Sequence, residues 1–328
     1  MNQPAPLLQV RGLTTQFATE EGLLTAVDNI SFSIQSGRTL GLVGESGCGK
    51  SVTGYSLMRL VQPPGKIVSG EVLLNGTDLL KLSDKEMRTM RGGKIGMVFQ
   101  EPMTSLDPLY PVRDPILETL SIHRGLKGAE AKAEAVRLLQ QAAIPEEEKR
   151  LASYPHQYSG GMRQRILIAS VLAGRPQVLI ADEPTTALDV TVQAQILALL
   201  RQLQQETGTA LLLITHNLGV VAENCHDVAV MYAGRIVERA PVRTLFASPR
   251  HPYTKGLLQA VPGPSTPPRQ PLQAISGSVP SLLRLPSGCR FLSRCPLAQP
   301  QCAQTEPALR SAGENHEAAC HLVETQER

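Results

Sequence analysis

Apolar positions along this chain follow two periods, one typical of strands and one typical of helices. Continuous apolar runs at 39–43, 94–99, 178–181 and 210–215 have the length of buried strands. Between them, helical spacing of apolar residues covers 129–142, 161–173 and 190–206. Runs of buried strands that alternate with helices are typical of an α/β fold with a parallel core sheet.

The N-terminal and C-terminal parts of the chain depart from this alternation. Segments 8–17 and 23–34 indicate two strands joined at Gly22, and 70–76 a further strand with a turn after it. Thirteen of the 25 prolines fall after residue 240. We therefore expect the C-terminal part to be rich in loops rather than a second compact sheet.

A glycine-rich segment between a predicted strand and a predicted helix carries the strongest chemical signal. It consists of Gly44, Glu45, Ser46, Gly47, Cys48, Gly49, Lys50 and Ser51. Glycines let successive backbone N–H groups turn inward around the phosphates of a nucleotide. Lys50 supplies a positive charge for the β- and γ-phosphates, and Ser51 a hydroxyl for Mg²⁺. The segment predicts a phosphate-binding loop for ATP.

Two acidic residues end the apolar strand at 178–181. In a parallel sheet, ligands bind beyond the carboxyl ends of the strands, which is where Asp182 and Glu183 lie. We expect Asp182 to hold Mg²⁺ and Glu183 to polarise the attacking water. Either residue alone could cap the next turn, but both together beside a phosphate loop indicate nucleotide hydrolysis.

Charge and hydropathy exclude several other classes. The formal net charge is +3 with both signs interspersed, so no basic face indicates nucleic-acid binding. No apolar run approaches the roughly 20 residues of a membrane-spanning helix, and the N-terminus lacks the features of a secretory signal. We expect a cytosolic protein, or one held at a membrane by its partners.

The segment Tyr158, Ser159, Gly160, Gly161, Met162 resembles the Leu-Ser-Gly-Gly-Gln signature of the ATP-binding subunits of ABC transporters, and departs from it at both flanks. The resemblance implies that two cassettes clamp two ATP molecules head to tail. Ser159, Gly160 and Gly161 then meet the γ-phosphate held by the partner subunit. It also implies an antiparallel edge sheet and a helical subdomain at about 103–173, in a nucleotide-binding domain at 1–245.

Further site residues follow from the same resemblance. Gln100 matches the glutamine that reaches Mg²⁺ and the attacking water, and His216 the histidine that contacts the γ-phosphate. Asp189 lies in the implied dimer-contact loop. Phe17 either stacks on adenine or packs in the core. With one phosphate loop, the chain is a single cassette.

The segment 249–254, followed by Leu257 and Leu258, is similar to the C-terminal extension of dipeptide and oligopeptide importer ATPases. We therefore expect an extension at 246–328. The resemblance implies a second ABC ATPase as partner, in a heterodimer. It also implies two transmembrane permease subunits, a periplasmic peptide-binding protein, and a place on the cytoplasmic face of the bacterial inner membrane.

Four of the six cysteines lie near the C-terminus, at Cys289, Cys295, Cys302 and Cys320. Four thiolates suit either a [4Fe–4S] cluster or a zinc site, and their spacing does not choose between these or free thiols and disulfides. The resemblance to dipeptide importer ATPases favours the cluster.

The sequence thus predicts an ATPase that powers import of dipeptides or short oligopeptides. A nickel or other solute importer of the same subfamily is an alternative, because solute choice resides in other subunits. A soluble ABC ATPase acting on ribosomes or DNA would usually carry two cassettes or a long coiled-coil insertion, and this chain has neither.

Overall fold

The computed structural model describes residues 5–100, 106–186, 188–261 and 274–323. They fall into two compact units. The helical unit comprises the described residues among 1–8, 34–38 and 78–212, and the loop unit those among 9–33, 39–77 and 213–328.

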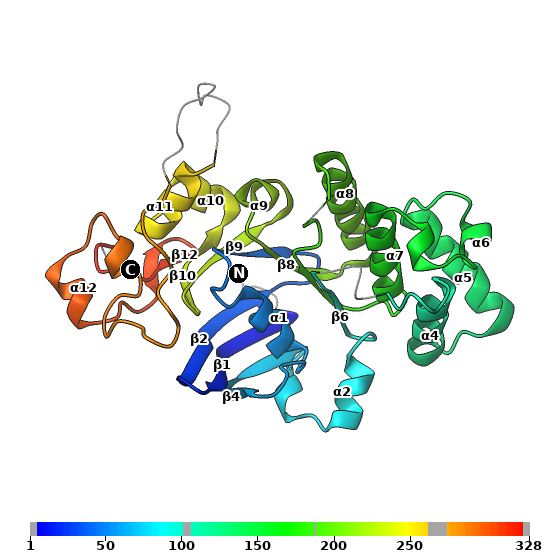
Figure 1. Ribbon diagram of the computed structural model, residues 1–328, viewed down its shortest axis with the longest axis horizontal. Coiled ribbons are helices and arrows are strands. Elements are labelled where there is room, and N and C mark those ends of the chain that lie inside the picture. The colour runs from blue at the N-terminus through cyan, green and yellow to red at the C-terminus, as the bar shows by residue number, and fades with distance from the viewer. Residues whose placement is uncertain (1–4, 101–105, 187, 262–273, 324–328) are drawn as a thin grey trace. The chain divides into compact units, whose positions relative to one another are not determined.

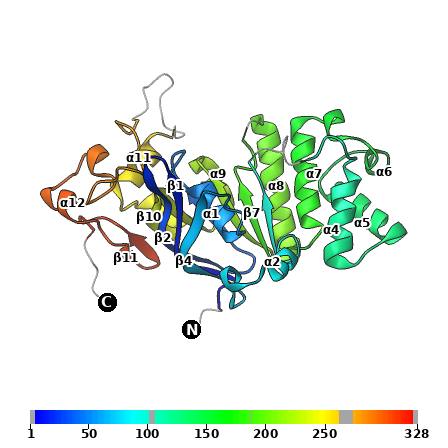
Figure 2. The same cartoon turned by 60° about the horizontal axis from the view of Figure 1, so that its bottom comes forward.

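The loop unit contains an antiparallel sheet and a second sheet that carries the phosphate loop. Strands β1 (Leu8–Thr19), β2 (Gly22–Ile34) and β4 (Gly65–Leu74) lie in the order β2-β1-β4, with the two-residue β5 (Thr77–Asp78) after β4. Helix α1 (Lys50–Leu57) packs on this layer, where the hydroxyls of Thr15 and Ser56 are 2.7 Å apart (Figure 2). The predicted N-terminal strands are confirmed.

The second sheet of the loop unit begins with the predicted buried strand. Strand β3 (Thr39–Val43) is buried throughout and pairs in parallel with β9 (Asp227–Tyr232). Antiparallel β10 (Arg235–Pro241), β12 (His316–Ala318) and β11 (Arg310–Gly313) continue it. Around these strands lie α9 (Leu218–Asn224), α10 (Val242–Ala247), α11 (Pro252–Gln259) and α12 (Pro300–Gln304) (Figure 1).

The helical unit contains the strands that end in candidate catalytic residues. Strands β6 (Ile95–Val98) and β7 (Val178–Asp182) are buried throughout and pair in parallel. Strand β8 (Ala210–Thr215) continues into the loop unit. The helices are α2 (Asp84–Met90), α4 (Arg113–Arg124), α5 (Gly128–Gln141), α6 (Glu147–Arg150), α7 (Gly160–Leu172) and α8 (Val190–Thr207). Helices α4, α5 and α7 pack against one another (Figure 1).

Local sequence explains where these helices begin and end. Ser83 and Glu86 form a capping box at the start of α2, and the Asp189 side chain accepts the Val192 N–H at the start of α8. Gly125 and Gly208 end α4 and α8 in the left-handed conformation that glycine adopts at low cost. The predicted helices at 129–142, 161–173 and 190–206 are confirmed within two residues.

The C-terminal segment, by which we mean the described residues among 246–328, contributes to the core of the loop unit. The rings of Tyr232, Tyr253 and Phe291 are fully buried together, with centroids 4.6–5.5 Å apart. As predicted, this part is mostly loops and short helices. The β11–β12 hairpin was not anticipated, because its short strands show no apolar alternation, and the hairpin joins the sheet through the pairing of β12 with β10.

No helix among the described residues is long and apolar enough to cross a membrane.

Candidate nucleotide site

The phosphate loop follows β3 and leads into α1, as the sequence predicts. Two of its glycines are required by close backbone approaches. A Cβ atom at Gly44 would lie 2.1 Å from the Met231 carbonyl oxygen, and one at Gly49 would lie 2.2 Å from the Ala26 carbonyl oxygen. Gly49 also has φ +105°, and Gly47 has φ +79° with open space where a Cβ would be. The loop therefore offers the unobstructed backbone that phosphates need.

Lys50 is held against the carbonyl oxygens of its own loop. Its Nζ donates to the carbonyl oxygens of Gly44 at 2.8 Å and Glu45 at 2.9 Å. Burial raises the pKa of the neighbouring Cys48 thiol, which outweighs the effect of the Lys50 charge, so Cys48 stays neutral. The ammonium group is therefore already inside the loop that would receive the β- and γ-phosphates.

In the helical unit, Gln100 and Glu183 come together beyond the ends of two adjacent parallel strands. Gln100 follows β6 and Glu183 follows β7, and the Gln100 amide donates to the Glu183 carboxylate at 3.4 Å. The Thr186 hydroxyl donates to the same carboxylate oxygen at 2.8 Å. Glu183 also adopts φ +45°, an uncommon conformation for a residue other than glycine. An amide and a carboxylate that converge in this way can orient and polarise a water molecule.

Asp182 is the last residue of β7 and is fully buried. Its carboxylate, the Gln100 amide oxygen and the Ser51 hydroxyl are the oxygen donors that Mg²⁺ prefers. Asp182 and Gln100 belong to the helical unit, while Ser51 and the exposed His216, just after β8, belong to the loop unit.

The segment resembling the signature starts α7. Ser159 is the N-cap, and its hydroxyl accepts the Met162 N–H at 3.4 Å. A Cβ at Gly161 would lie 2.5 Å from Val192 Cγ1, so glycine lets the start of α7 approach α8. Gly160 is exposed and next to it. The start of α7 therefore presents a helix N-terminus and a hydroxyl, which is a suitable end for binding an anion.

Tyr158, which replaces the leucine of the signature, has a structural explanation. Its side chain is buried, and its hydroxyl donates to the Arg150 carbonyl oxygen at 2.5 Å. The departure from the signature thus fixes the segment before α7 to the end of α6.

Comparison with known proteins identifies the family. The ABC transporter family model matches residues 27–186, and the model of the oligopeptide/dipeptide transporter C-terminal region matches 237–302. The oligopeptide transport ATP-binding protein OppD of Salmonella typhimurium is 50% identical over 306 residues, which are 93% of this chain and 91% of that protein. The chain belongs to the ABC transporter ATP-binding subunits, in the oligopeptide/dipeptide family.

Two further comparisons agree with this assignment. The dipeptide transport ATP-binding protein DppD of Escherichia coli is 45% identical and covers 96% of each chain. Among solved structures, the dimeric ATP-binding cassette MJ0796 in a post-hydrolysis state with ADP and Pi is 28% identical. It matches with a TM-score of 0.65, covering 72% of this chain and 99% of that one. The predicted ABC cassette fold and ATP hydrolase activity are confirmed for this ABC ATPase.

Two other residues that the sequence indicated, Asp189 and Phe17, make contacts within this ABC ATPase. Asp189 caps α8, as described above. Phe17 is half-buried on β1, and a Cβ added at Gly65 would lie 2.5 Å from its ring, so the ring lies over Gly65 of β4. Its stacking on adenine stays a prediction.

The four C-terminal cysteines surround one cavity of about 10 Å³ in the loop unit. Burial, followed by the nearby thiols of Cys302, Cys295 and Cys320, raises the pKa of Cys289 to about 11. All four are free thiols. The donor set suits a metal site, yet no group of three or more His, Cys, Asp or Glu side chains among the described residues is arranged to hold a metal ion. A cavity of this size has room for about one water molecule.

Sequence analysis missed two residues that touch the phosphate loop from the C-terminal segment. The Tyr253 hydroxyl accepts the backbone N–H of Glu45, and the Arg294 guanidinium pairs with the Glu45 carboxylate. Tyr253 lies in the segment that resembled the importer extension, but nothing in that resemblance indicates this contact.

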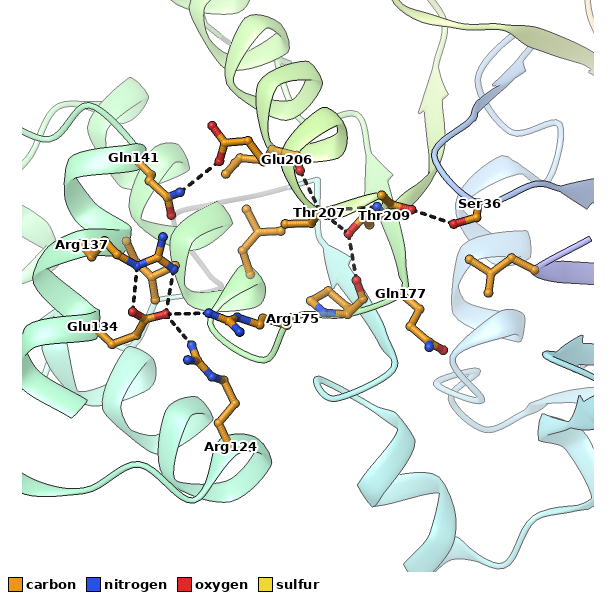
Figure 3. Close-up of a pocket in the computed structure, with 16 residues that line it drawn as sticks. Ser36, Arg124, Glu134, Arg137, Gln141, Arg175, Gln177, Glu206, Thr207 and Thr209 are labelled. Atoms are coloured by element: carbon orange, nitrogen blue, oxygen red, sulfur yellow. Dashed lines mark hydrogen bonds and ion pairs between the residues drawn. The ribbon is translucent and has the colours of Figure 1, made fainter. Parts of the chain in front are cut away.

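A separate cavity of about 570 Å³ lies in the helical unit and is lined by α4, α5, α7 and α8. Figure 3 shows Arg124, Arg137 and Arg175 around the single carboxylate of Glu134. The hydrogen bond from Arg137 is the largest effect that lowers the pKa of Glu134, to about 2. Through this one carboxylate, ion pairs connect α5 to α4 and to the residues that follow α7. The cluster therefore has a structural role, because it holds these helices together.

Proposed function

We propose that this ABC ATPase hydrolyses ATP to drive the import of dipeptides or short oligopeptides. The observation that carries the proposal is the meeting of Gln100 and Glu183 beyond the ends of β6 and β7. In a chain that also carries a phosphate loop and a signature-like helix start, this pair has the chemistry of water activation. The match of the C-terminal region to the oligopeptide/dipeptide transporter family supports the choice of solute.

Each residue then has a role that follows from its chemistry. The loop from Gly44 to Ser51 binds the phosphates, with Lys50 on the β- and γ-phosphates, and Phe17 stacks on adenine. Ser51, Gln100 and Asp182 hold Mg²⁺, which neutralises phosphate charge when bound. Glu183 polarises the attacking water, and His216 donates a hydrogen bond to the γ-phosphate. Ser159, Gly160 and Gly161 serve the ATP held by the partner, and Asp189 contacts that partner.

The assembly follows from the incomplete nature of one cassette. Because the signature-like segment acts on the partner's ATP, the active form contains a second ABC ATPase, which we propose is a different chain. Two transmembrane permease subunits complete the importer, and a periplasmic binding protein delivers the peptide. The protein then lies on the cytoplasmic face of the bacterial inner membrane, with a cassette at 1–245 and an extension at 246–328.

The catalytic role is tested with Glu183→Gln in the assembled transporter whose partner site is disabled. We expect ATP binding to persist and hydrolysis to fall by about 10²-fold or more, because the amide cannot accept a proton from water. Glu130→Gln, an exposed change in the first turn of α5, is the control. Hydrolysis near the unmodified rate in Glu183→Gln would refute the role of Glu183.

The transport role is tested by purifying the tagged protein from its native membranes in mild detergent. Co-purification of two multi-span proteins, a second ABC ATPase and a peptide-type binding protein is expected. A binding protein that takes nickel and no peptide would favour the metal importer. Recovery with ribosomes or nucleic acid and no membrane protein would refute transport.

We propose that Cys289, Cys295, Cys302 and Cys320 bind a [4Fe–4S] cluster, with a zinc site as the alternative. The four free thiols that line one cavity are the donors that either site needs. The described thiols are not arranged to hold a metal ion, so binding requires them to rearrange, and a bound metal would then stabilise a loop-rich segment. Iron, sulfide and zinc are measured after anaerobic purification of the unmodified protein, Cys295→Ser and, as the matched control, Cys225→Ser. Cys225 is a free thiol that does not line this cavity. Equal metal content in all three would contradict the assignment.

A further inference from the structure

One residue of the phosphate loop, Glu45, is held on three sides. Its carboxylate accepts two hydrogen bonds from Arg294, Nη1 to Oε2 at 2.6 Å and Nη2 to Oε1 at 2.9 Å. Its backbone N–H donates to the Tyr253 hydroxyl at 2.9 Å, and its carbonyl oxygen accepts from Lys50. Arg294 and Tyr253 both come from the C-terminal segment, 249 and 208 residues away in sequence.

Contacts outside the phosphate loop also hold the Arg294 side chain in place. It is only 3% exposed, and its Nε donates to the Ser276 carbonyl oxygen at 3.0 Å. Its guanidinium carbon lies 5.8 Å from the centre of the Tyr232 ring, a cation–π distance. A guanidinium held in this way keeps its two-bond geometry toward a carboxylate, which a flexible lysine would not.

Tyr253 is equally rigid. Its side chain is fully buried between Tyr232 and Phe291, and burial raises the pKa of its hydroxyl, so it stays neutral. The Glu45 amide is therefore directed at a fixed oxygen atom. The conformation of the loop at this residue is set by the C-terminal segment and not by the loop sequence alone.

The charge of Glu45 makes this contact relevant to nucleotide binding. A carboxylate within the phosphate loop repels the phosphates of ATP unless a cation neutralises it, and the repulsion is strong where water is partly excluded. We propose that Arg294, together with Tyr253, is a positioning residue of the nucleotide site, which neutralises and orients Glu45 so that the loop accepts the phosphates of ATP. The affinity of this cassette for ATP then depends on its C-terminal segment.

A second buried arginine in the same segment provides a matched control. Arg290 pairs with Asp28 and Glu306, and its Nη1 donates to the Ala233 carbonyl oxygen at 2.6 Å. None of these three partners belongs to the phosphate loop. Arg290→Ala therefore removes a buried arginine of the same segment without exposing the charge of Glu45.

The test measures binding of a fluorescent ATP analogue to the full chain, and the KM for ATP and kcat of the assembled transporter. The variants are Arg294→Ala, Arg294→Lys, Arg290→Ala and Arg294→Ala combined with Glu45→Gln. We expect Arg294→Ala to weaken ATP binding and raise KM by about tenfold, with kcat at saturating ATP changed by less than about threefold. Arg294→Lys should restore part of the affinity, and adding Glu45→Gln to Arg294→Ala should restore most of it.

The combined variant separates charge from scaffolding. If Arg294 acts only as a structural brace, adding Glu45→Gln cannot recover affinity, and Arg290→Ala weakens ATP binding as much as Arg294→Ala. Either result would overturn the proposal, as would an affinity of Arg294→Ala within about twofold of the unmodified protein.

Discussion

Glu238 gives the most demanding test of how the C-terminal segment is attached. Its side chain is 0% exposed and accepts the backbone N–H of Arg250 at 2.6 Å and of His251 at 2.9 Å. The His316 Nε2 lies 2.7 Å from the same carboxylate. One carboxylate on β10 thus joins the start of α11 and the β11–β12 hairpin. Although burial acts in the opposite direction, the hydrogen bonds hold the pKa of Glu238 below its ordinary value.

The magnitude follows from what the substitution leaves behind. Glu238→Ala removes the acceptor and leaves two backbone donors and one histidine without their partner in a buried site, which costs about 3–5 kcal/mol. Glu238→Gln keeps the shape of the side chain and one acceptor oxygen, so we expect it to lower the free energy of unfolding by only about 2 kcal/mol. Because β12 pairs with β10 at this residue, with Glu238 opposite Ala318, the β11–β12 hairpin should lose most of its protection from hydrogen exchange.

Hydrogen exchange measured by mass spectrometry reports this loss locally. Backbone amides at 310–320 should exchange about a hundredfold or more faster in Glu238→Ala than in the unmodified protein, and less so in Glu238→Gln. Glu317→Gln is the matched control, because Glu317 pairs with Arg239 on the same two strands but is 36% exposed. Glu317→Gln should lower the free energy of unfolding by about 0.5 kcal/mol. Equal exchange at 310–320 in Glu238→Ala and Glu317→Gln would refute the reasoning.

Three shorter predictions concern other parts of the chain. Glu134→Gln should lower the free energy of unfolding by about 1–2 kcal/mol at pH 7, after allowance for solvent screening. Because the pKa of Glu134 is depressed from 4.5 to about 2, this contribution is complete well above pH 4.5 and is lost as pH falls toward 2. Denaturant unfolding of both proteins at pH 7 and pH 3 should therefore show the difference in unfolding free energy shrinking by about half. Gly44→Ala should abolish binding of a fluorescent ATP analogue, because its Cβ would lie 2.1 Å from the Met231 carbonyl oxygen; binding within about threefold of normal would show that the loop can shift. Tyr158→Leu, which restores the leucine of the family signature, should lower the free energy of unfolding by about 0.5–1.5 kcal/mol, and with it the thermal midpoint, because the Arg150 carbonyl oxygen loses the Tyr158 hydroxyl and keeps only the Ser153 N–H; an unchanged midpoint would contradict that account.

Much of the nucleotide site could be predicted from the sequence because its determinants are local. The glycines, Lys50 and Ser51 lie within eight residues, between a strand and a helix that apolar spacing also predicts. The acidic pair at the end of β7 and the serine that caps α7 are likewise fixed by their immediate neighbours. Such short-range features need only the backbone conformation that the local sequence favours.

The tertiary structure alone decided what holds these local features in place. The hydrogen bond between Gln100 and Glu183 depends on the parallel pairing of β6 with β7, which their apolar runs do not specify. The contacts from Arg294 to Glu45 and from His316 to Glu238 join residues 249 and 78 positions apart. A charged residue can pair with any opposite charge that folding brings near it, so its sequence position does not reveal its partner. For this reason the sequence determined the chemistry of the phosphate loop, whereas only the fold showed that the C-terminal segment holds it.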